Sequence, residues 1–162
     1  MNPASASSVS MLRHTLATLA YRGAKALRAA PPEFAQFRVA EETRSPGEIL
    51  AHMGDLLDWA LSLAEGAQRW RNSVPLSWDD EIARFFEALH KLDQRLASAP
   101  IPEKTADGLF QAPIADALTH LGQISMLRRI AGSPVRGENY LRATIAAGNV
   151  GPNQAPPGLE FD

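Results

Sequence analysis

A carboxylate and an imidazole stand four residues apart in this chain, at Asp116 and His120, so on a helix they would lie on one face. A second imidazole, His52, lies far upstream. If two helices bring these groups together, they form a metal site with three protein ligands and a position left for water or substrate. The alternatives are a core histidine at position 52, hydrogen-bonded to a neighbour, and a solvated helix flank at positions 116 and 120.

The segments that carry these residues have the periodicity of amphipathic helices. One covers about residues 45–66 and opens with Ser45-Pro46-Gly47-Glu48, a serine cap with a glutamate three residues later. His52 shares its apolar face, which predicts that the imidazole points inward. The other covers about residues 113–131 and ends at Gly132-Ser133-Pro134.

Two further helices complete the predicted fold, at about residues 8–28 and from Ser77 to just before Pro100. We expect an all-α protein, a four-helix bundle with long inter-helix connections and an irregular C-terminal tail. Residues 1–162 would form a single domain, with its core at about residues 8–131 and a C-terminal extension from about residue 132. Asn139 to Ala147 could add one short helix, and no segment predicts a convincing strand.

Composition excludes several classes of function. The formal net charge is −2 and basic residues are not clustered, so nothing favours nucleic acid or an anionic membrane surface as a partner. Cysteine is absent, which excludes disulfides, thiolate ligands and a cysteine nucleophile. With no apolar run long enough to span a membrane and no secretory signal pattern, we expect a cytoplasmic protein.

Two of the segments also resemble motifs of the DinB-like superfamily, whose members are metal-binding four-helix bundles. Ser45 to Asp55 is similar to that family's second-helix motif, and Asp116 to Gln123 is similar to its fourth-helix motif, in which Gly-Gln follows two residues after a histidine. The resemblance extends from the first helix to about Arg129. The order and spacing of the four helices agree with it.

The resemblance implies a ligand set for a divalent metal. The family holds its metal with one residue of the second helix and two, four apart, of the fourth, which fall on His52, Asp116 and His120. Histidine is usual where this chain has Asp116, so the site is harder and less cationic than a set of three imidazoles. Zinc or nickel is the first expectation, and manganese or iron is also compatible with such a set.

Supporting roles fall to residues near the predicted ligands. Gln123 lies one turn after His120 and could orient a ligand or cofactor; the alternative is a glutamine exposed to solvent. Arg128 could hold an anionic substrate; the alternative is an arginine that binds the C-terminus of its helix. Asp55, one turn after His52, could accept an imidazole N–H, although exposure to solvent is the simpler expectation.

Three functions are compatible with these residues. The resemblance implies a metal-dependent enzyme acting on a small-molecule substrate, with thiol-transferase or hydrolase-like chemistry and a low-molecular-weight thiol as a candidate cofactor. The second interpretation is a non-catalytic binding or stress-response module whose metal site is weak or absent. The third is an all-helical interaction protein that pairs into a homodimer through an exposed apolar helix face.

Overall fold

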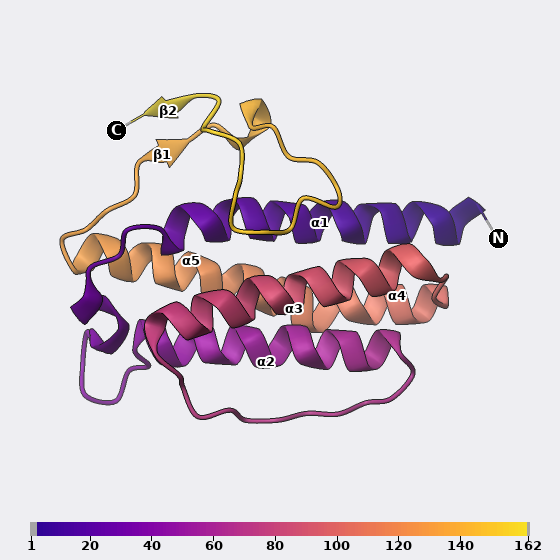
Figure 1. Cartoon of the computed structure of the whole chain (residues 1–162), viewed down its shortest axis with the longest axis horizontal. Helices are drawn as coiled ribbons and strands as arrows, with labels where there is room; N and C mark the ends of the chain where they lie inside the picture. The colour runs from indigo at the N-terminus through magenta and orange to yellow at the C-terminus, as the bar shows by residue number, and fades with distance from the viewer. Residues whose placement is uncertain (1–2, 162) are drawn as a thin grey trace.

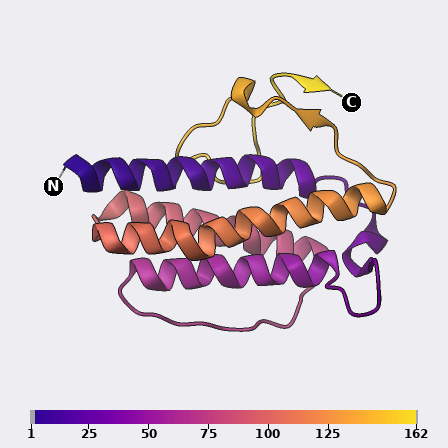
Figure 2. The ribbon, with the colours of Figure 1, turned by 180° about the vertical axis from the view of Figure 1, so that it is seen from behind.

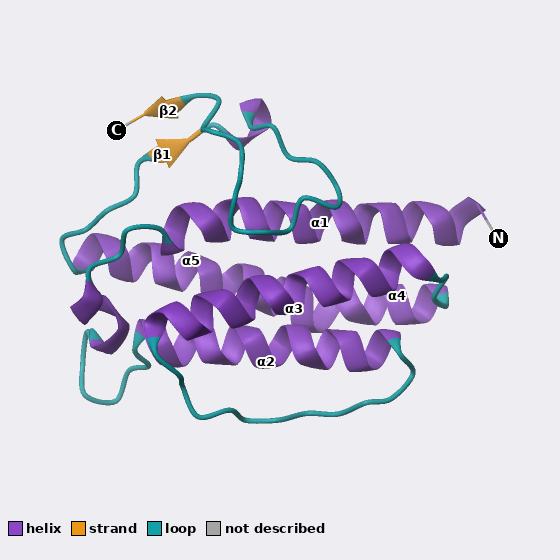
Figure 3. Ribbon diagram, in the orientation of Figure 1, coloured by secondary structure: helices purple, strands orange, loops and turns teal. Residues whose placement is uncertain are grey.

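The computed structural model describes residues 3–161, and these residues are mainly helical (Figures 1 and 3). The four long helices are α1 (Pro3–Leu27), α2 (Pro46–Ala64), α3 (Trp78–Ser98) and α5 (Ala115–Ile130), and a shorter helix, α4 (Glu103–Leu109), precedes α5. Strands β1 (Gly137–Glu138) and β2 (Glu160–Phe161) pair antiparallel. None of the helices in the described part of the chain is both long enough and apolar enough to cross a membrane.

The long helices lie side by side, as both the front view and the view from behind show (Figures 1 and 2). Helix α2 packs against α3 and α5, and α1 packs against the same two helices. Residues 65–77 run back along the length of α2, so that α3 begins beside the start of α2 and follows the same direction (Figure 1). The helix that carries His52 therefore lies directly against the helix that carries Asp116 and His120.

The predicted starts of α2 and α3 are confirmed. Ser45 caps α2 in a complete capping box, in which its hydroxyl accepts from Glu48 N while the Glu48 carboxylate accepts from Ser45 N. Ser77 caps α3 by accepting from Asp80 N. These caps satisfy backbone donors that the first turn of a helix leaves without partners, and so fix where each helix begins.

The core lies between the four long helices and is made of aliphatic and aromatic side chains. The fully buried ones include Leu16, Leu19, Leu50, Met53, Leu57, Phe85, Leu89, Leu92 and Ile124. Gly23 of α1 faces the ring of Phe85, and a Cβ at this glycine would lie 2.8 Å from a ring carbon. Glycine therefore permits the close approach of α1 and α3 at this point.

The last long helix, predicted from about Pro113 to Ala131, is α5, but the helical path that leads into it begins earlier than the sequence indicates. The helical path begins at Glu103 in α4, passes through a π-helical turn, η2 (Phe110–Ile114), and continues as α5. Proline has no N–H to donate, and the wider π-turn accommodates it inside the helix without ending it. A proline that would suit the first position of a new helix thus lies in the middle of a longer one.

The C-terminal segment packs along α1 (Figure 1) and also differs from the prediction. In place of a helix from Asn139 to Ala147, it has one short turn, η3 (Tyr140–Arg142), and the β1–β2 pair. The carboxylate of Glu138, in β1, is buried, and it accepts from Tyr21 Oη (2.7 Å) and Lys25 Nζ (2.8 Å) of α1. These contacts fasten the C-terminal segment to the outer side of α1, away from α2.

Candidate metal centre

The three predicted ligands converge. His52 of α2 faces Asp116 and His120 of α5, and one potential ligand atom of each residue lies within 4.8 Å of the other two. His52 Nε2 lies 3.7 Å from Asp116 Oδ2, and His120 Nε2 lies 3.5 Å from Asp116 Oδ1. The imidazole rings meet edge to face, with their centroids 4.8 Å apart. This group, called the His–Asp–His group below, could hold a metal ion.

Its dimensions suit a small divalent ion. Tetrahedral bonds of about 2.0–2.1 Å place neighbouring ligand atoms about 3.3–3.5 Å apart. The two carboxylate–imidazole distances, each to a different oxygen of Asp116, are close to that value, and one ligand atom from each of the three residues lies within 4.8 Å of the others. About half of the Asp116 side chain is exposed (47%), while those of His52 and His120 are 21% and 12% exposed. The carboxylate therefore lies on the solvent side, where a further ligand can approach.

Gln123 fixes the tautomer of His120. Its Oε1 lies 2.8 Å from His120 Nδ1, and because a carbonyl oxygen only accepts, Nδ1 carries the proton. Nε2, the atom that faces Asp116, then keeps its lone pair. In metal sites, the imidazole nitrogen that does not bind the metal usually donates a hydrogen bond to an acceptor of this kind. The structure thus places the predicted Gln123 in contact with a predicted ligand.

His52 is the member of the His–Asp–His group that contacts the connection between α2 and α3. The ring of Trp70, from this connection, packs edge to face on the His52 imidazole, with 5.7 Å between the ring centroids. Burial lowers the pKa of His52 below its ordinary value, and the charges of His120 and Arg44 act in the same direction. The shift favours the neutral imidazole, which is the form that binds a metal.

Asp55 anchors the connection, and the expectation that it is exposed is wrong. Its buried carboxylate accepts from Ser73 N (2.8 Å) and Ser73 Oγ (2.6 Å), and also from Arg84 of α3. Gly54 leaves room for the Arg84 guanidinium, since a Cβ there would lie 2.9 Å from Arg84 Cζ. The connection that carries Trp70 is thereby held against α2 beside His52.

Arg128 does not belong to this site. Its buried guanidinium donates to the carbonyl oxygens of Ala26, Arg28 and Ser133, at 2.7–3.0 Å. It also lies eight residues after His120, about 12 Å along the helix axis. Arg128 therefore ties the end of α5 to the end of α1, and its predicted role in holding a substrate or cofactor is replaced by a structural one.

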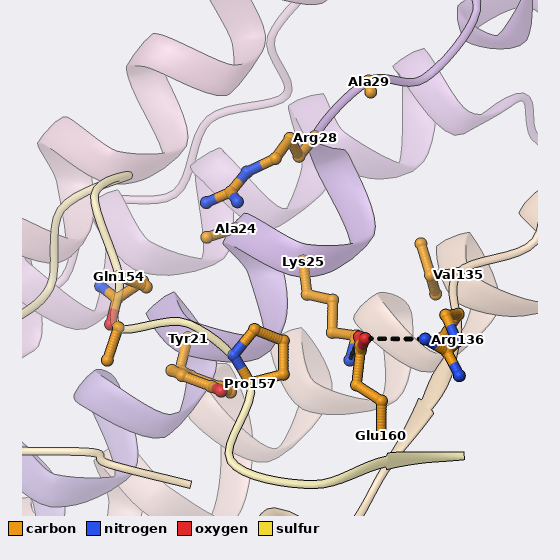
Figure 4. Close-up of a pocket in the computed structure, with 11 residues that line it drawn as sticks. Tyr21, Ala24, Lys25, Arg28, Ala29, Val135, Arg136, Gln154, Pro157 and Glu160 are labelled. Carbon is orange, nitrogen blue, oxygen red and sulfur yellow. Dashed lines mark hydrogen bonds and ion pairs between the residues drawn. The ribbon is translucent and has the colours of Figure 1, made fainter.

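Two cavities of about 230 Å³ have different relations to this chemistry. One adjoins His52 and is lined by Arg44, Glu48, His52, Asp55, Asn72, Ser73 and Pro75; it is called the His52 cavity below. The other lies between α1 and the C-terminal segment, where Glu160 pairs with Lys25 at 2.7 Å and with Arg136 at 3.5 Å (Figure 4). Its wall includes none of the His–Asp–His group, so of these two cavities only the His52 cavity adjoins the candidate metal centre.

Sequence reasoning missed most of the cavity wall. Arg44 precedes the predicted cap of α2, and Asn72, Ser73 and Pro75 lie in a connection without apolar periodicity. The available signal was Asp55, an acidic residue in the middle of an apolar helix. Such a residue needs a polar partner from elsewhere in the chain. The sequence does not show that this partner is Ser73.

Comparison with known proteins gives this site no counterpart. No protein-family model matches the chain, and no match is found among the curated proteins or the solved structures.

Proposed function

We propose that this protein is a divalent-metal-dependent enzyme with the four-helix bundle of the DinB-like superfamily, acting by thiol-transferase or hydrolase-like chemistry. The two sequence segments that resemble the family's motifs support the proposal, because they carry histidine at two of the three ligand positions, His52 and His120, and a carboxylate, Asp116, at the third. The arrangement of α2 against α5 also suits it. The observation that carries the proposal is the convergence of His52, Asp116 and His120.

Each residue of the group has a separate task in this proposal. His52 and His120 supply neutral imidazole nitrogens, and Asp116 supplies one negative charge, which leaves a divalent site with a net charge of about +1. When bound, a divalent ion provides a Lewis acid that lowers the pKa of a water or thiol in its open position. Gln123 keeps the His120 ring oriented. Trp70 limits the access of water to His52 from the side of the connection.

Zinc or nickel suits this set best. Two imidazoles and one carboxylate, with room for a further ligand, are a common coordination set for zinc in enzymes. The carboxylate oxygen also keeps manganese and iron compatible with the site. A low-molecular-weight thiol is the cofactor that the family resemblance suggests, since thiols bind these softer ions strongly.

Metal analysis tests the proposal directly. The purified protein, equilibrated with zinc or nickel and then desalted, should retain about one ion per chain. His52→Ala and His120→Ala should each lose it, whereas His14→Ala, which alters an exposed histidine on α1, should retain it. A native protein that retains no metal after this treatment would refute the enzyme proposal and favour the non-catalytic binding module, for which the exposed position of Asp116 is the supporting observation.

A further inference from the structure

The His52 cavity shares one wall with the His–Asp–His group, because His52 belongs to both. Its volume of about 230 Å³ is below that of pockets for drug-sized ligands and suits a molecule of a few carbon atoms. A small ligand in this cavity would therefore lie against the His52 ring, one of the three proposed metal ligands. The hydrogen-bonding groups of the wall indicate what kind of molecule it accepts.

The two carboxylates of this wall are already engaged. Glu48 accepts from Arg38 Nη2 (2.7 Å) and from Ser45 N (2.8 Å), and these contacts lower its pKa. Asp55 accepts from the serine and arginine described above. Both negative charges are thus balanced by the protein, so neither calls for a cationic ligand.

The donors of the wall, in contrast, are free. The side chain of Arg44 forms no hydrogen bond or ion pair with residues 3–161, although it is close enough for its charge to act on His52. Asn72 accepts from Trp70 Nε1 through Oδ1 (3.1 Å), and its amide nitrogen donates to none of the described residues. The cavity therefore offers one guanidinium and one amide N–H₂ group to a ligand.

We propose that the ligand of this site is a small molecule with a carboxylate group, which Arg44 and Asn72 hold while the opposite end of the molecule reaches the metal. A guanidinium binds a carboxylate through two parallel hydrogen bonds, and an amide N–H₂ can add a third. The single positive charge of the Arg44 guanidinium matches the single negative charge of a carboxylate ligand. A phosphate dianion would bring a second negative charge, for which the residues that line the cavity offer no further unpaired cation. This inference rests on the proposed function, since it names the substrate class of the same metal site.

The experiment compares two thiols that differ in their second group. The zinc-loaded protein is titrated with 3-mercaptopropionate, which has a carboxylate, and with 2-mercaptoethanol, which has a hydroxyl. The native protein should bind 3-mercaptopropionate about tenfold more tightly, a typical effect of one charge-assisted contact near the surface. Arg44→Gln should abolish this preference with its zinc content unchanged.

Arg71→Gln is the matched control, because Arg71 is an exposed arginine of the nearby connection that pairs with Asp58 (3.3 Å) outside the cavity. It should keep the full preference. The inference is overturned if the native protein binds the two thiols equally, if Arg44→Gln retains the preference, or if inorganic phosphate displaces 3-mercaptopropionate at equal concentration. Circular dichroism confirms the fold of each variant.

The two proposals fail in distinguishable ways. If the native protein retains no metal, the enzyme proposal fails, and the cavity is then tested on the metal-free protein. Propionate should change the fluorescence of Trp70, whose indole donates to Asn72, in the native protein and in Arg71→Gln but not in Arg44→Gln. No response in the native protein, or an equal response in Arg44→Gln, would exclude the carboxylate site whatever the metal does.

Discussion

Asp55→Asn is expected to destabilise the protein and to release the connection between α2 and α3. The native carboxylate, 3% exposed, accepts two hydrogen bonds from Ser73 and one from the Arg84 guanidinium. Asparagine keeps the shape of the side chain but loses the charge and one acceptor oxygen. The change therefore removes the negative charge and one acceptor while it leaves the packing of the side chain nearly unaltered.

The expected loss of stability depends on the ion pairs that Arg84 keeps in Asp55→Asn. Removing one partner of a buried ion pair costs about 3–5 kcal/mol. Here the guanidinium keeps Asp58 at 3.0 Å and Glu81 at 3.6 Å, so we expect a smaller loss, of about 2–3 kcal/mol. For a domain of this size, that corresponds to a decrease in Tm of about 5–10 °C.

The same reasoning predicts a pH dependence. Burial opposes ionisation of Asp55, but the hydrogen bonds from Ser73 and the charge of Arg84 outweigh it, and the pKa of Asp55 lies below its ordinary value. A lowered pKa gives stability that is fully present above the unfolded pKa, about 3.9, and is lost as the pH falls through the folded pKa. The difference between native protein and Asp55→Asn should be constant from about pH 5 to 8 and shrink below about pH 4.

Urea denaturation at several pH values measures this difference. Asp58→Asn is the control, because Asp58 also pairs with Arg84 but is 30% exposed, and it should cost less than about 1 kcal/mol. Trp70 fluorescence should shift to longer wavelength in Asp55→Asn before global unfolding, as the released connection exposes the indole to water. Equal losses in both variants, or a difference that is as large at pH 3 as at pH 7, would refute the assigned role of Asp55.

Three further changes test other contacts. Gln123→Ala should weaken metal binding about tenfold or more by freeing the His120 ring, and an unchanged affinity in a metal titration would show that the ring needs no such partner. Glu138→Gln should lower the free energy of unfolding by about 2–3 kcal/mol in urea titration, because a buried carboxylate loses its charge-assisted contacts with a tyrosine and a lysine of α1; a loss under 0.5 kcal/mol would contradict this. Gly54→Ala should cost about 1–2 kcal/mol by displacing the Arg84 guanidinium, so a more stable variant, as helix propensity alone predicts, would be the opposite result.

The parts of the fold that sequence reasoning predicted are those set by local chemistry. The cap at Ser45 and the apolar stripe around His52 depend on neighbouring residues, so the start of α2 and the inward side of the helix could be inferred. The spacing of Asp116 and His120 likewise placed both on one face of α5. Their meeting with His52 was expected from the family resemblance, and the structure brings the three residues together.

The parts that could not be predicted depend on contacts between distant segments. Glu138 lies in a segment without periodicity, and only its approach to Tyr21, 117 residues earlier, makes it a buried anchor. Ser73 and Trp70 become part of the site because Asp55 holds their connection against α2. The helical path before Pro113 was missed for a different reason: proline is common at the start of a helix, and the sequence does not show that here it lies within a π-helical turn.

The π-helical turn η2 allows the helical path that carries the site to hold an extra residue without changing the direction of its faces. A π-turn contains one residue more than a regular α-helical turn, and its wider path absorbs that residue. The buried faces on either side of it, at Leu109 and Leu121, therefore both point to the core. Removing Gln111, whose side chain is exposed, would leave a regular turn, keep both faces in place and cost stability only because Pro113 would then lie inside a regular helix. A second residue inserted there would add a rotation of about 100°, and we expect it to turn Asp116 and His120 away from His52.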